Sequence, residues 1–110
     1  MVDEKNSPSQ GVLGLKELVS YQQGSVVSRE IIRKNTGTVT LFAFDEGQGL
    51  SEHTAPFDAL VYIVDGDAEI TISGQVHKVS EGEMLILPAG QTHSLQALHK
   101  FKMMLVMIRS

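Results

Sequence analysis

The side chains of this chain that can both bind a metal ion and exchange a proton near neutral pH are its histidines. The 110 residues include His53, His77, His93 and His99, and no cysteine. Zinc–thiolate sites, disulfides and cysteine nucleophiles are therefore excluded. His77 and His99 each lie beside a lysine close to an expected turn, so we expect both to face solvent.

His53 and His93 differ from the other two because each lies in a patterned stretch. His53 falls in GQGLSEHTAPFDALVYIVDG, residues 47–66, and His93 ends GEMLILPAGQTH, residues 82–93. Each stretch places a histidine a short distance from glycines at expected turns. These two imidazoles are the candidates for a functional site.

The two stretches resemble the motifs of the cupin superfamily, G-x5-H-x-H-x3,4-E-x6-G and G-x5-P-x-G-x2-H-x3-N. The residues that match are Gly47, His53 and Gly66 in the first motif and Gly82, Pro88, Gly90 and His93 in the second. The resemblance covers nearly everything after residue 24. It implies an all-β fold, a small jelly-roll barrel of the double-stranded β-helix kind.

The departures from the family pattern concern the metal site. The resemblance implies two histidines and a glutamate from the first motif, but Ala55 and Ala59 stand at the second histidine and the glutamate. Three interpretations remain open. The barrel is metal-free with His53 and His93 as polar pocket residues, or both are structural, or Asp58 completes a set that binds iron, manganese, zinc or nickel.

Short β-rich segments separated by turn residues must position these side chains. The predicted strands are residues 25–32, 38–45, 59–64, 67–72, 76–79, 83–88, 93–98 and 101–108. Residues 1–11 are predicted to be a flexible leader, and residues 12–110 a single barrel domain. A short helical turn or an edge strand is expected within residues 12–21.

Two of the predicted strands, residues 59–64 and 101–108, are apolar on both faces. Such strands need a dry environment on each side, and in a domain of this size a second subunit supplies it most simply. The pattern therefore predicts a homodimer.

Charge and hydropathy exclude other partners. The formal net charge of −4 disfavours nucleic acid, and the longest apolar run is far below the ~20 residues that span a bilayer. We expect a cytoplasmic, small-molecule-binding barrel with its pocket at His53, Asp58, Tyr62 and His93. The alternative is a metal-dependent enzyme, of dioxygenase or isomerase type, acting on a small oxygenated or aromatic substrate.

Overall fold

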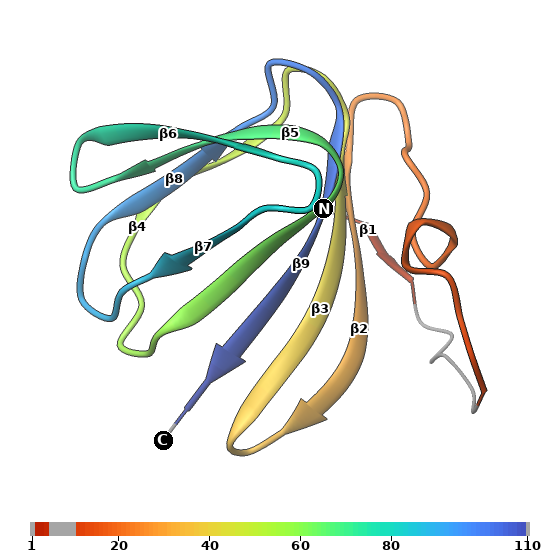
Figure 1. Cartoon of the computed structure of the whole chain (residues 1–110), viewed down its shortest axis with the longest axis horizontal. Helices are drawn as coiled ribbons and strands as arrows, with labels where there is room; N and C mark the ends of the chain where they lie inside the picture. Colours follow the sequence, from red (N-terminus) through yellow and green to blue (C-terminus); the bar gives the residue numbers. More distant parts are fainter. Residues whose placement is uncertain (1, 5–10, 110) are drawn as a thin grey trace.

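The computed structural model describes residues 2–4 and 11–109, and nearly all of its regular structure is β-strand (Figure 1). The elements are β1 (Val2–Glu4), the 3-10 helix η1 (Leu15–Glu17), β2 (Val26–Lys34), β3 (Gly37–Phe44), β4 (Gly49–His53), β5 (Ala59–Ile72), β6 (Gln75–Ser80), β7 (Met84–Leu87), β8 (His93–Gln96) and β9 (Phe101–Ile108). The predicted all-β fold is confirmed. No helix in the described ranges has the length and apolar character needed to cross a membrane.

The strands form two sheets that face each other and close into a barrel (Figure 1). The first sheet has the order β1-β2-β3-β9-β5-β7, and the second has the order β6-β5-β8-β4. All neighbours are antiparallel except β1 and β2. Several of the strands that meet are far apart in the sequence, such as β3 with β9 and β4 with β8, which is typical of a jelly roll.

Strand β5 belongs to both sheets because it bends where a turn was predicted. The sequence predicts two strands separated at Asp65–Gly66, and this is wrong: one strand continues through a register shift between Ile63 and Asp65. Gly66 has φ +73°, and a Cβ there would lie 2.5 Å from the carbonyl oxygen of Lys100. Glycine is therefore required at this position, beside the bulge.

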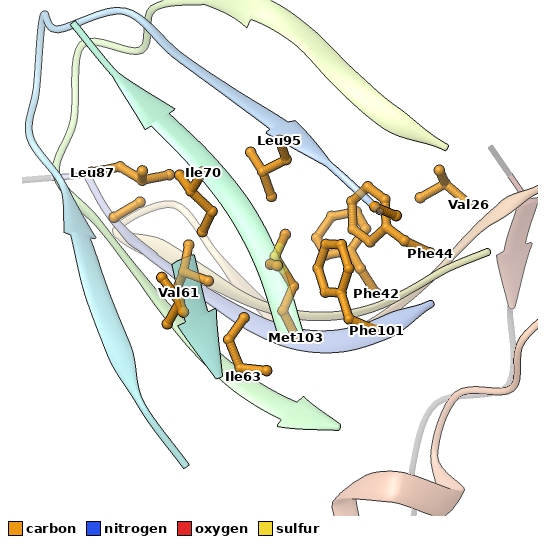
Figure 2. Packing of buried hydrophobic residues seen from close by; sticks show 14 residues of the cluster. Val26, Phe42, Phe44, Val61, Ile63, Ile70, Leu87, Leu95, Phe101 and Met103 are labelled. Carbon is orange, nitrogen blue, oxygen red and sulfur yellow. The ribbon is translucent and has the colours of Figure 1, made fainter. Parts of the chain in front are cut away.

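Apolar side chains from both sheets fill the barrel (Figure 2). Along β5, Ala59, Val61 and Ile63 alternate into this core, while the residues between them face outward. The rings of Phe44 and Phe101 stack with centroids 4.5 Å apart. The polar side chains of β4 and β8 lie at one end of the barrel, beyond this apolar core.

The segment before β2 crosses the outer face of the first sheet. It buries Val19, which is 1% exposed, in a second apolar cluster with Val27, Leu41, Ala43 and Val64. We call residues 15–21 the cover segment and this set of residues the outer cluster. Of the predicted leader, residues 2–4 pair with β2, and residues 5–10 lie outside the described residues.

Strand β4 was not predicted from the sequence. Its residues, GLSEH, have no alternating apolar pattern, and all but Leu50 are exposed. The strand forms because its backbone pairs with β8. Tertiary pairing thus overrides a weak local preference at the strand that carries His53.

Candidate functional site

His53 and His93 lie at the same end of the barrel because their strands are paired. Their Cα atoms are partners in the register of β4 and β8, next to a register irregularity between Leu50 and His53. His93 is two residues before the buried Leu95, so strand alternation turns its side chain inward. His93 is 7% exposed, whereas His53 is exposed at the barrel end.

The two imidazole rings contact each other directly. Their Nε2 atoms are 3.1 Å apart, and the rings meet edge to face with centroids 4.3 Å apart and an interplanar angle of 70°. The Nδ1 atom of His53 is 2.7 Å from the carbonyl oxygen of Ser51. The Nδ1 atom of His93 is buried and has no hydrogen-bond partner in the described part of the chain.

The environment of His93 favours its neutral form. Burial lowers the pKa of His93, and the nearby imidazole of His53 lowers it further. The backbone of Gln91 raises the pKa and so partly offsets these two effects. At neutral pH we therefore treat His93 as uncharged.

Asp58 does not join the histidine pair. Its Oδ1 atom accepts a hydrogen bond from the backbone N–H of Ala89 at 2.8 Å, and the carbonyl of Ala55 accepts one from Gly90 at 2.8 Å. These bonds tie the loop after β4 to the loop after β7. The side chain expected as a third metal ligand thus holds the two loops together.

Tyr62 lies on the other side of the barrel wall from the histidines. Alternation along β5 places it outward, against the outer cluster, because Val61 and Ile63 occupy the inward positions. There it lines a cavity of about 470 Å³ together with Leu15 and Lys16 of the cover segment. The expectation that Tyr62 belongs to the histidine pocket is corrected on this geometry.

The donor set of the pair is too small for an ordinary metal centre. Across residues 2–4 and 11–109, no three His, Cys, Asp or Glu side chains form a group suited to holding a metal ion. First-row metals in proteins normally take three or four protein ligands. The residues present therefore do not fit the metal that the family resemblance implies.

Sequence reasoning missed the backbone contribution of Ser51 to this site. Its carbonyl oxygen fixes Nδ1 of His53, but a main-chain acceptor leaves no trace in residue type. The distance of two residues between Ser51 and His53 is the only available signal. The remaining histidines lie apart from the pair: His99 is exposed with Nδ1 3.8 Å from Glu46, and His77 is half-buried on β6.

Comparison with known proteins agrees with this fold. A family model described as "Cupin domain" matches residues 40–109. A conserved protein of unknown function from Streptococcus pyogenes has a similar structure, with TM-score 0.90 and 35% identity, over 100% of this chain and 96% of the other.

Two further relatives extend the likeness. A cupin superfamily protein from Desulfitobacterium hafniense superposes with TM-score 0.89 and 27% identity, over 96% of this chain and 97% of the other. An uncharacterized protein of Aquifex aeolicus is 28% identical over 81 residues, 72% of this chain and 67% of that protein. The two solved structures share the fold of this chain, and none of the three proteins is described with an activity.

Proposed function

Because the chain belongs to the cupin domain family, we propose that it binds a small molecule at the pair of His53 and His93 without a metal ion. The observation that carries the proposal is the direct contact of the two Nε2 atoms at 3.1 Å. A contact this short between two ring nitrogens requires a proton or an ion between them.

The position of that proton follows from the partners of the rings. The Ser51 carbonyl can only accept, so Nδ1 of His53 donates, and a neutral His53 then has a lone pair on Nε2. His93 must donate from its own Nε2 to that lone pair. Its Nδ1 is then an acceptor, which is the buried atom without a partner.

This arrangement selects the ligand group. When the pair opens, the neutral Nε2 of His53 accepts and the Nε2–H of His93 donates. A hydroxyl group fills both roles at once, since it donates and accepts. A carboxylate would need two donors, which the lowered pKa of His93 disfavours at neutral pH. We therefore propose a hydroxyl-bearing ligand.

The metal-dependent enzyme is the weaker candidate. Two Nε2 ligands at about 2.1 Å from one ion would also be near 3 Å apart, so the distance does not separate the candidates. The number of protein ligands does separate the two candidates. Asp58 accepts a hydrogen bond from Ala89, and alanines stand at the other two ligand positions of the family.

Histidine ¹⁵N NMR tests the proposal on protein purified without added metal. At pH 8 we expect His53 protonated at Nδ1 and His93 at Nε2. In a fragment screen of matched pairs, such as benzyl alcohol with benzyl methyl ether, the hydroxyl member should shift both imidazole signals more. His99→Ala is the control, because His99 is remote from the pair and should not change either response.

The metal content of the purified protein distinguishes the metal-free site from the metal-dependent enzyme. About one equivalent of transition metal per chain, lost in His53→Ala and in His93→Ala, would favour the metal-dependent enzyme. Methyl ethers that bind as well as their alcohols would contradict hydroxyl recognition while leaving the metal-free site in place.

A further inference from the structure

The cavity that Tyr62 lines lies between the cover segment and the outer face of the first sheet. We call it the outer cavity. Its volume is about 470 Å³, and small-molecule sites typically measure about 300–1,000 Å³. Leu15 of the cover segment and Tyr62 and Val64 of β5 form its apolar side. Tyr62 is half-buried there, and Val64 is 5% exposed. A ligand that fills this space must therefore have an apolar body.

Hydrogen bonds hold both walls of the outer cavity in place. On one side, the turn between β6 and β7 is bound to β5. The N–H of Gly82 donates to the carbonyl of Ile63 at 2.9 Å, and the N–H of Ile63 donates to the carbonyl of Glu83 at 3.0 Å. On the other side, the ammonium of Lys102 donates to the carbonyl of Lys16 at 2.6 Å. The walls are therefore pre-formed, which lowers the entropic cost of binding.

The charged groups of the outer cavity leave one negative charge in excess. The carboxylates of Glu17 and Glu81 line it from the two walls, with the ammonium of Lys16 as the one cation in the lining. That ammonium is divided between Glu81, 3.3 Å away, and Asp65, 3.7 Å away. Within residues 2–4 and 11–109, Glu17 forms no ion pair. The cavity therefore offers a carboxylate that no protein cation neutralises.

We propose that the outer cavity binds a small organic ammonium ion, that is, a protonated amine with an apolar body. The apolar body packs against the apolar side, and the ammonium lies between Glu17 and Glu81. The ring of Tyr62 adds a cation–π contact. Lys16 gives way readily, because its pair with Glu81 joins side chains that are 55% and 54% exposed, and such pairs contribute little. Lys16 keeps Asp65 as a partner.

The same charges disfavour other ligands of the same shape. An anion has to separate Lys16 from Glu81, and it then lies close to the carboxylate of Glu17. A neutral alcohol leaves the excess negative charge unbalanced. For one apolar body we therefore expect affinity to fall from amine to alcohol to carboxylate. Added salt should reduce the advantage of the amine, because it screens attraction between charges near the surface.

Fluorine NMR of protein that contains 3-fluorotyrosine tests the proposal on the full chain. The chain has two tyrosines, Tyr62 in the outer cavity and Tyr21 in the cover segment, and Tyr62→Phe assigns their signals. At pH 7 and low salt, we expect benzylamine to shift the Tyr62 signal saturably. Its affinity should be several-fold higher than that of benzyl alcohol, and phenylacetate should bind most weakly. In 500 mM NaCl the difference between amine and alcohol should shrink.

Variants of single carboxylates locate the ammonium group. Glu17→Gln and Glu81→Gln should each weaken benzylamine binding roughly two- to fivefold, because each removes one exposed attraction between charges. Glu52→Gln is the matched control, since it removes the same charge from β4 on the second sheet, and it should leave the Kd for benzylamine unchanged. All three side chains are exposed, and circular dichroism shows that each variant has folded.

Three results would each overturn the proposal. They are equal affinities for benzylamine and benzyl alcohol, no shift of the Tyr62 signal by benzylamine, and an unchanged Kd for benzylamine in both Glu17→Gln and Glu81→Gln. The imidazole ¹⁵N signals of His53 and His93 report the other site separately. The amine site and the hydroxyl site can therefore each fail without the other.

Discussion

The outer face of the first sheet has two halves that differ in what covers them. In one half, the outer cluster lies beneath the cover segment, and Leu41 and Val27 are 0% and 2% exposed. In the other half, the strand register sets five aliphatic side chains side by side: Ile32, Val39, Val106, Leu60 and Ile86. We call them the aliphatic row. Within residues 2–4 and 11–109 no segment covers them, although Val39 is on the same strand as Leu41 and points to the same side. Among the residues that the structure describes, the cover segment therefore buries only one half of this face.

Strand alternation explains why both halves are apolar but not why they differ. Alternate residues of β3 face outward at 39, 41 and 43, whichever segment lies above them. The cover comes from residues 15–21, which reach one half only. An apolar outer face becomes dry only where something covers it, and in the covered half a distant segment of the same chain does so.

Polar contacts hold the cover segment on its half. The hydroxyl of Tyr21 donates to Asp65 at 2.7 Å, and Lys16 is 3.3 Å from Glu81 and 3.7 Å from Asp65. The ammonium groups of Lys100 and Lys102 each lie 4.9 Å from the centre of the Tyr21 ring. The Tyr21 hydroxyl lowers the pKa of Asp65, and the charge of Lys16 contributes in the same direction.

The largest expected difference between the two halves is the loss in free energy of unfolding when a valine is replaced by alanine. Val27→Ala should destabilise the fold by about 2 kcal/mol, because it opens a cavity in a buried cluster. Val39→Ala, on the partly exposed row, should cost under about 1 kcal/mol. Urea denaturation of the two single variants beside the unmodified chain measures both costs. Equal costs would mean that the row is as well packed as the outer cluster.

A smaller effect is expected at the bond that fixes the cover segment. Tyr21→Phe removes the hydrogen bond to Asp65 and should lower the free energy of unfolding by about 1 kcal/mol. Tyr62→Phe is the matched control, because Tyr62 packs against the same cluster outside this bond. If the two variants lose the same stability, the bond to Asp65 does not hold the cover in place.

The smallest effects are expected from pH, and they separate the barrel end from the covered half. The pKa of His93 is lowered from 6.5 on folding, so the unfolded chain binds more protons near that pH. Stability should therefore fall as the pH drops below about 7 towards the lowered pKa. Thermal unfolding between pH 8 and pH 5 measures this slope, and His93→Gln should flatten it.

Asp65 acts in a more acidic range. Its pKa is lowered from 3.8 on folding, so its contribution is present above that value and is lost as the pH falls through the folded pKa. Asp65→Asn should flatten the profile below about pH 4 and leave the histidine range unchanged. A single transition affected by both variants would mean that the two regions are coupled.

The sequence predicted the all-β fold and the two histidines that the structure brings within 3.1 Å. It did so because motif spacing and turn residues are local properties. The single strand through Gly66 and the strand of residues 49–53 were missed, because each depends on hydrogen bonds to a segment far along the chain. Tyr62 was misplaced for a related reason. The sequence of a strand that is apolar on both faces does not show which of its alternating side chains face the barrel interior.

The sequence alone therefore determined most of the strands, where most turns lie, and that alanines stand at two of the metal-ligand positions that the family resemblance implies. Only the tertiary structure decided that Asp58 binds the loop at Ala89, that Ser51 orients His53, and that half of an apolar face stays uncovered. The physical reason is that periodicity sets the direction of a side chain along its own strand. What that side chain meets depends on strands and segments that pair across long stretches of sequence.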